Sequence, residues 1–265
     1  MPPAVFRVKR IPAALFALFA AATLSGQSEP LLVPEVSQSR VEVRQGFTGA
    51  NLLLYGAIVD PDAPRAGIEG ASPYDIAVVL KGPSEPIRLR EKERLAGIWM
   101  NARSSDFRSA PAFFAIASSR PIPDIVDRRT AAIYELGTDF IQLSPTGQIE
   151  AEEQVRFARG LVELRQREGL YKQDFDGVRI SEGVLYQARI ALPSNVVTGQ
   201  YTAETFAIAD GRVLASATAD IEVVKTGLEG QVVRASQNWS LFYGLGAVAL
   251  SLTMGWFAGR IFSRS

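Results

Sequence analysis

The chain has 265 residues and a formal net charge of zero, with 28 basic and 28 acidic residues and neither cysteine nor histidine. This balance argues against nucleic-acid binding, which depends on a concentrated cationic surface. The missing residue types exclude disulfides, His-based triads, cysteine nucleophiles and thiolate or imidazole metal ligands, and we expect neither a metal nor a cofactor.

The N-terminal segment, residues 1–28, has the composition of an export signal. Basic residues between Arg7 and Arg10 precede an uncharged run, Ile11 to Leu24, and small residues follow. As a helix the run would measure ~21 Å, too short for a ~30 Å hydrocarbon core. We therefore predict a cleaved signal peptide rather than an uncleaved anchor. Two cleavage sites, after Ala22 and after Ser25, remain open.

Residues 29–226 are predicted to form a mainly β domain. Apolar runs, alternating or continuous, indicate strands. Asp210-Gly211 is a strong hairpin signal, because both residue types tolerate a positive φ. The expected strands lie at 41–43, 52–59, 74–80, 87–93, 111–117, 184–192, 200–209 and 212–224.

Two helices interrupt this β pattern. One is expected at 124–136, and the stronger at 151–168, with Glu152 and Glu153 in its first turn and Gly169 after its end. We predict an immunoglobulin-like β-sandwich with a helical insertion at about 120–172. Two smaller domains divided near residue 172 are the alternative.

A cationic strand is the first candidate site. Arg88, Arg90, Lys92 and Arg94 occupy alternate positions, so a strand would place all four on one face. Such a face could receive a small anion or lipid headgroups. The alternative is an edge strand that its charges keep soluble and unpaired.

Acidic clusters give weaker signals. Asp174-Phe-Asp176-Gly177 resembles the opening of a calcium loop, but Leu185 occupies the position of the bidentate acid, so we expect a turn. Asp60, Asp62 and Asp75 could bring carboxylates together for hydrolysis, although proline beside aspartate is typical of turns.

Three large aromatic side chains of the same region are expected in the core. They are Trp99, Phe113 and Phe114, and large aromatic residues are more often buried than exposed as ligand platforms.

The C-terminal segment has the length of a membrane span. Ala235 to Gly259 carries no formal charge, and Arg260 and Arg264 follow it. We predict a juxtamembrane linker at 227–238, a transmembrane helix at 239–259 and a cytoplasmic tail at 260–265. This single-pass topology embeds the chain in a lipid bilayer, with the main domain outside the cytoplasm.

Small residues recur every fourth position in the predicted span, at Ala247, Ser251, Gly255 and Gly259. This spacing forms a face on which a second helix can approach closely. The face predicts self-association or a polytopic membrane partner. General enrichment of small residues in membrane helices is the alternative.

Several stretches together resemble a family of uncharacterised single-span transmembrane proteins found mainly in alphaproteobacteria. They are Gly46-Phe-Thr-Gly49, Leu54-Tyr-Gly-Ala-Ile58, Arg90-Glu-Lys-Glu-Arg-Leu-Ala-Gly-Ile-Trp-Met-Asn101, Ala117-Ser-Ser-Arg-Pro121, Gln166-Arg-Glu-Gly-Leu-Tyr171, Leu192-Pro-Ser-Asn with Gly199-Gln-Tyr201, and Leu241-Phe-Tyr-Gly244. The resemblance implies a bacterial inner-membrane protein with a periplasmic domain. It also implies an association with permeases of the sulfite-exporter type.

Three functions follow from these observations. The first is a membrane-anchored binding or accessory protein without catalytic activity, acting beside a transporter or an envelope complex. The second is a periplasmic receptor for small anions that uses the cationic strand. The third is a carboxylate-dependent hydrolase.

Overall fold

The predicted signal peptide, the linker at 227–238, Asp62 and Arg264 lie outside the residues that the computed structural model describes. Those residues are 30–44, 46–60, 72–95, 97–147, 150–226 and 240–262.

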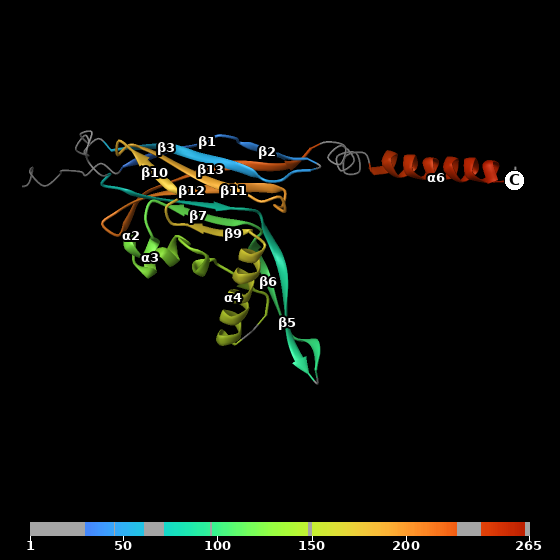
Figure 1. The fold of residues 1–265 in the computed structure, drawn as a ribbon, viewed down its shortest axis with the longest axis horizontal. Helices are drawn as coiled ribbons and strands as arrows, with labels where there is room; N and C mark the ends of the chain where they lie inside the picture. Colours follow the sequence, from blue (N-terminus) through green and yellow to red (C-terminus); the bar gives the residue numbers. More distant parts are fainter. Residues whose placement is uncertain are drawn as a thin grey trace, which may run out of the picture.

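The described chain is mainly β, as predicted, and its strands form three sheets (Figure 1). The first sheet is antiparallel, in the order β1 (Leu31–Val36), β3 (Ala50–Val59), β11 (Leu185–Leu192) and β10 (Val178–Ser181). The second has the order β2 (Arg40–Val43), β13 (Arg212–Lys225), β12 (Gly199–Ala209), β4 (Asp75–Lys81), β7 (Phe114–Ser118) and β9 (Tyr171–Asp174). The third contains β5 (Ser84–Leu95), β6 (Ile98–Pro111) and the short β8 (Ser144–Pro145).

The first and second sheets pack against each other around one hydrophobic core. Burial alternates along β11, which therefore turns only one face inward. By contrast, Ile76 to Leu80 in β4 and all of β7 are buried. Their continuous apolar sequences fit strands covered on both faces, by the first sheet and by the helical segment.

The helical segment follows β7 and covers the outer face of the second sheet (Figure 1). The rings of Tyr134 and Phe206 pack edge to face there, with centroids 5.4 Å apart. The segment contains α2 (Ile122–Ile125), α3 (Arg128–Ile133), the 3₁₀ helix η2 (Thr138–Phe140) and α4 (Ala151–Arg167). The last described helix of the chain is α6 (Ser240–Phe262).

The prediction of one helix at 124–136 is wrong, because two short helices, α2 and α3, occupy this region. Val126 is extended, with φ −143°, and ends α2. The Asp127 carboxylate then accepts a hydrogen bond of 2.7 Å from the Thr130 amide and caps α3. A short acidic side chain that can bond nearby backbone amides favours a new helix start over continuation.

The strand orders β1–β3–β11–β10 and β13–β12–β4 are compatible with the A–B–E–D and G–F–C orders of immunoglobulin-like sandwiches. Near the start of β12, the Tyr201 hydroxyl donates a 2.7 Å hydrogen bond to the Val197 carbonyl, as a tyrosine corner does. These features support the immunoglobulin-like assignment, which stays a prediction.

Candidate functional site

The β5–β6 hairpin leaves the body of the sandwich and projects beyond it (Figure 1). Its strands pair from Ser84 with Pro111 to Leu95 with Ile98, and Gly97 adopts φ +86° in the connection. Glycine reaches this φ without steric cost, which permits the tight reversal. The register shifts twice, once between Glu85 and Ile87 and again between Glu91 and Lys92. Such irregularities increase the local bend and twist.

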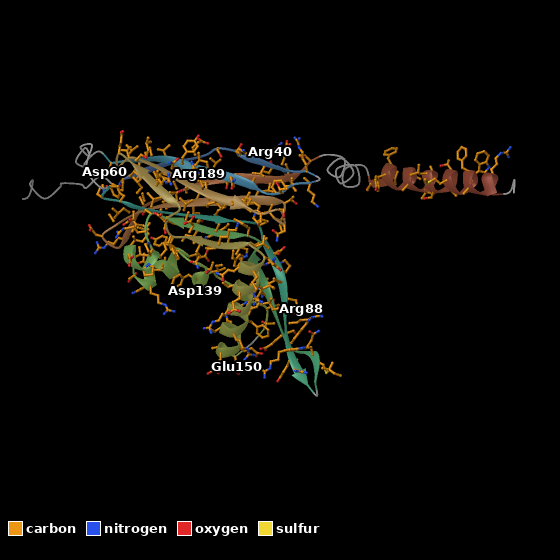
Figure 2. All side chains as sticks on the ribbon, in the orientation of Figure 1. Arg40, Asp60, Arg88, Asp139, Glu150 and Arg189 are labelled. Carbon is orange, nitrogen blue, oxygen red and sulfur yellow. The ribbon has the colours of Figure 1, made fainter. Side chains whose placement is uncertain are left out.

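The cationic face of β5 consists of the four residues predicted from the sequence: Arg88, Arg90, Lys92 and Arg94. All four are exposed, and β5 is an edge strand of its sheet. Figure 2 shows Arg88 on the part of the hairpin that has left the sandwich. The structure thus brings the predicted cations together on the accessible side of a projecting element.

One member of the cationic face is neutralised by its cross-strand neighbour. The Arg88 guanidinium donates two hydrogen bonds to Asp106, from Nε to Oδ1 at 2.6 Å and from Nη2 to Oδ2 at 2.9 Å. These bonds hold the pKa of the Asp106 carboxyl below its ordinary value. Arg94 Nε donates to the Gly97 carbonyl, whereas Arg90 and Lys92 form no ion pair with any residue that the structure describes.

The opposite face of the hairpin is held by α4. Arg165 of α4 pairs with Glu85 at 2.7 Å, and Arg156 pairs with Glu91 at 3.3 Å. Phe157 and Leu161 of α4 are buried. The helix therefore supports the base of the hairpin and engages two of its acidic side chains, which leaves the cationic face free of helical cover.

The hairpin tip, Ile98, Trp99 and Met100, exposes three consecutive large apolar side chains. Their exposed fractions are 67%, 67% and 52%. The expectation that Trp99 belongs to the core is therefore wrong, whereas Phe113 and Phe114 are fully buried as predicted. Composition could not separate these cases, because the tip lies beyond the reach of the sandwich. A strand signal at 98–111, paired with 87–93 across Gly97, would have placed Trp99 at a tip.

The two described carboxylates among those proposed for hydrolysis, Asp60 and Asp75, have separate partners. Asp75 accepts hydrogen bonds from Arg120 Nε at 2.9 Å and from the Ser119 hydroxyl at 2.8 Å. The Tyr74 hydroxyl donates to Asp60, and burial together with this aspartate raises the pKa of Tyr74 to about 12. These contacts are ion pairs and hydrogen bonds of the kind that stabilise a folded domain.

A lysine between two glutamates lies on the outer face of the second sheet. Lys81 Nζ is 2.6 Å from Glu135 Oε2 and 2.9 Å from Glu204 Oε2. Burial alone would lower the pKa of Lys81, but hydrogen bonds to both glutamates hold it above its ordinary value. The cluster ties the loop after α3 to β4 and β12.

The Asp174–Gly177 segment forms the predicted turn between β9 and β10, with the Asp176 amide donating to Asp174 Oδ1 at 3.2 Å. Among the described residues, no group of three or more His, Cys, Asp or Glu side chains could hold a metal ion.

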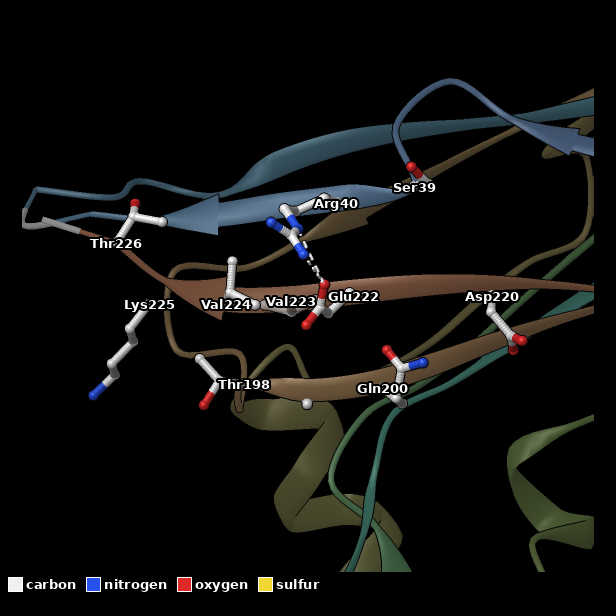
Figure 3. Close-up of a pocket in the computed structure, with 11 residues that line it drawn as sticks. Ser39, Arg40, Thr198, Gln200, Asp220, Glu222, Val223, Val224, Lys225 and Thr226 are labelled. Atoms are coloured by element: carbon white, nitrogen blue, oxygen red, sulfur yellow. Dashed lines mark hydrogen bonds and ion pairs between the residues drawn. The ribbon is translucent and has the colours of Figure 1, made fainter. Parts of the chain in front are cut away.

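A polar groove of about 850 Å³ lies where β2, β12 and β13 run together (Figure 3). Arg40 donates to Glu222 Oε2 from Nε at 3.0 Å and from Nη2 at 2.7 Å. These opposite charges compensate each other across the strands, and Asp220 lies further along β13. The groove therefore offers no concentrated charge to a ligand.

The C-terminal helix α6 is apolar and exposed throughout its described side chains. Ser240–Arg260 has a mean hydropathy of 1.5 and is long enough to cross a membrane. Its small-residue face, Ala247, Ser251, Gly255 and Gly259, meets no other described element, and Ser251 Oγ donates to the Ala247 carbonyl at 2.9 Å. That internal bond satisfies the hydroxyl in an apolar environment.

Together these elements define a membrane-anchored single-pass protein with a β-rich domain. The chain belongs to the family described as "Putative transmembrane protein (Alph_Pro_TM)", whose model matches residues 31–264. This confirms the alphaproteobacterial family that the sequence resembles. No curated protein matches the chain.

Proposed function

We propose that this protein is a membrane-anchored accessory protein without catalytic activity, and that the β5–β6 hairpin is its contact element. The observation that carries the proposal is the projection of this hairpin, with an apolar tip and a cationic face both exposed. Exposed clusters of large apolar side chains are characteristic of interaction sites, since they otherwise reduce solubility.

The architecture of the hairpin supports a role in contact. Ion pairs of Glu85 and Glu91 with α4 brace one face of the hairpin from its base to beyond its middle, while nothing described covers its tip. A braced element with an uncovered end presents the same surface to each partner and loses little conformational freedom on binding.

The residue types available favour binding over catalysis. The chain has no histidine or cysteine, and the two described aspartates among those singled out for hydrolysis are occupied: Asp75 by Arg120, and Asp60 by Tyr74. Hydrolysis by paired carboxylates requires one acid and one base at a defined separation around a substrate. The partners of these aspartates supply no such pair.

We place the protein in the bacterial inner membrane, with the β domain in the periplasm and the C-terminus in the cytoplasm. Arg260 directly after the apolar run, and Arg264 beyond it, follow the excess of positive charge on cytoplasmic segments. The predicted N-terminal signal gives the same orientation.

Within the membrane, the small-residue face of α6 is the surface on which a second helix would pack. The partner would be another copy of the chain or a polytopic protein, such as the permeases of the sulfite-exporter type that the family resemblance implies. A transporter subunit beside α6 would place the β domain at the transporter's periplasmic side.

A receptor for small anions is the second candidate, favoured by the absence of ion pairs at Arg90 and Lys92 among the described residues. These side chains lie on an exposed strand, however, whereas small-molecule sites are usually concave and largely enclosed. The accessory role therefore explains more of the features of the hairpin than the receptor role does.

Photo-crosslinking in native membranes tests the contact role. A benzophenone amino acid would replace Met100 at the hairpin tip or, as a control, Arg212, which is exposed at the start of β13 next to the Asp210-Gly211 turn. After irradiation, mass spectrometry would identify lipid and protein adducts. We expect adducts from position 100 well above those from position 212. Equal yields from both positions would contradict the proposal.

A further inference from the structure

We propose that the hairpin tip binds the surface of an anionic phospholipid bilayer, with its apolar side chains in the interfacial layer and the cationic face against the headgroups. The inference rests on the proposed function, because it names the ligand of the same contact element.

The apolar side chains of the tip project from both faces of the hairpin, as they would in an environment that surrounds the tip. Trp99 lies opposite Arg94, while Ile98 and Met100 lie opposite Leu95 and Glu93. Because side chains alternate along a strand, Trp99 projects from one face and its two neighbours from the other. A groove on a protein would cover one face, whereas a membrane interface covers both.

The length of the apolar tip also matches the depth to which proteins insert into a membrane interface. Three residues of a strand span ~10 Å, and interfacial elements bury their apolar faces ~5–10 Å into the boundary between headgroups and acyl chains. Tryptophan favours this layer, because its ring is apolar and its indole N–H can meet polar headgroups.

The charges lie where headgroups would be. Arg94 is the cross-strand neighbour of Trp99, and Lys92 follows ~7 Å further from the tip. Long basic side chains can extend toward phosphate while their stems remain beside apolar groups. Glu93 is the described acid nearest the tip, and Glu91 is paired with Arg156 of α4. The cationic face thus keeps a positive excess once Arg88 is paired with Asp106.

A bilayer is a better occupant than a protein for a tip of this size. A stable protein interface buries roughly 800 Å² on each partner, more than three side chains on a narrow convex turn provide. A bilayer requires no matching pocket. The anchor also limits the distance to the surface, because the 14 residues between the end of β13 at Lys225 and the start of α6 at Ser240 can span at most ~50 Å.

The full-length chain in lipid nanodiscs provides the test. Because the natural sequence lacks cysteine, Ile98→Cys creates a unique site for an environment-sensitive fluorophore, and Arg212→Cys creates the matched control. Each labelled protein would be placed in phosphatidylcholine discs, and in discs that also contain phosphatidylglycerol. Emission wavelength and quenching by aqueous iodide would be measured.

We expect the label at position 98 to shift to shorter wavelength and to be quenched several-fold less in the anionic discs, with no change at position 212. Replacing Arg90, Lys92 and Arg94 by serine should reverse this effect, since each basic residue contributes roughly fivefold to affinity for an anionic surface. Trp99→Ser is the second variant and should weaken protection without altering charge. Circular dichroism would verify that both variants fold.

Equal quenching at positions 98 and 212 in the anionic discs would overturn the inference. Protection that is the same without phosphatidylglycerol would overturn the role given to the cationic face. If the label remains in water while position 100 forms protein adducts in native membranes, the lipid inference fails and the contact role stands. Failure of both experiments removes both proposals.

Discussion

Arg88 and Asp106 face each other across β5 and β6, joined by hydrogen bonds of 2.6 Å and 2.9 Å. This ion pair neutralises one cation of the exposed face in the unliganded protein. Arg90, Lys92 and Arg94 therefore provide the available positive charge, and the amount available depends on Asp106.

Asp106→Asn should strengthen binding to anionic bilayers. The substitution removes a negative charge and frees the Arg88 guanidinium, so we expect several-fold greater protection of the tip label at equal lipid charge. Asp220→Asn makes the same change in net charge on β13 and is the control. An equal gain from the two variants would show that net charge, not the hairpin, determines binding.

Tyr201→Phe should destabilise the β domain by about 1–2 kcal/mol, because it removes the hydrogen bond that the Tyr201 hydroxyl donates to the partly buried Val197 carbonyl. Tyr201 is fully buried, and its hydroxyl reaches the Val197 carbonyl at 2.7 Å. Thermal unfolding followed by circular dichroism measures the change. Tyr55→Phe, at an exposed position, is the control. An unchanged midpoint for Tyr201→Phe would mean that the corner adds nothing to stability.

Two glycine substitutions should act in opposite directions. A Cβ at Gly56 would collide with the Val33 carbonyl and lie 2.5 Å from the buried Tyr186 hydroxyl, so Gly56→Ala should cost about 3 kcal/mol. Gly160 lies exposed in α4, where an added Cβ would have nothing within 4 Å beyond the backbone of its own helix. Gly160→Ala should therefore stabilise the domain by about 0.5–1 kcal/mol. Unfolding midpoints that move in the same direction would contradict this interpretation.

Elements with strong local signals could be predicted from the sequence. The helix expected at 151–168 is α4, Ala151–Arg167, with Gly169 at φ +72° after its end. The hairpin expected at Asp210-Gly211 joins β12 to β13, with both residues at positive φ. In these cases the local sequence and the tertiary fold favour the same conformation.

Only the β5 half of the β5–β6 hairpin could be predicted from the sequence. The alternation of Arg88 to Arg94 places the cations on one face correctly, but the strand from Ile98 to Pro111 lacks a regular alternation and has two register shifts with β5. The exposure of Trp99 depends on how far the hairpin extends beyond the core. Such long-range geometry is not encoded in a local pattern.

Acid should weaken the domain partly through Asp75. Hydrogen bonds from Arg120 and Ser119 hold the pKa of Asp75 below its ordinary value of 3.8. Because the folded pKa is the lower one, the contribution to stability is present above about pH 4 and is lost as pH falls through the folded pKa. Asp75→Asn should therefore flatten the pH dependence of the unfolding midpoint in this window. A variant as acid-sensitive as the wild type would contradict this assignment.

The small-residue face of α6 should govern association within the membrane. Ser251→Leu with Gly255→Leu places bulky side chains on that face, so we expect crosslinked complexes in native membranes to disappear while the β domain keeps its unfolding midpoint. Thr253→Leu with Phe257→Leu alters the opposite side of the helix and should leave the complexes intact. Complexes that survive the first pair would place the association elsewhere.

Cysteine labelling in spheroplasts tests the central claim most directly, because any introduced cysteine is unique in this chain. Single cysteines at positions 98, 212 and 263 would be exposed to a membrane-impermeant maleimide before and after lysis. We predict rapid labelling at 212, slow labelling at 98, and labelling at 263 only after lysis. Labelling at 98 as rapid as at 212 would show that the hairpin tip makes no contact at the membrane, and protection of 212 before lysis would contradict the orientation.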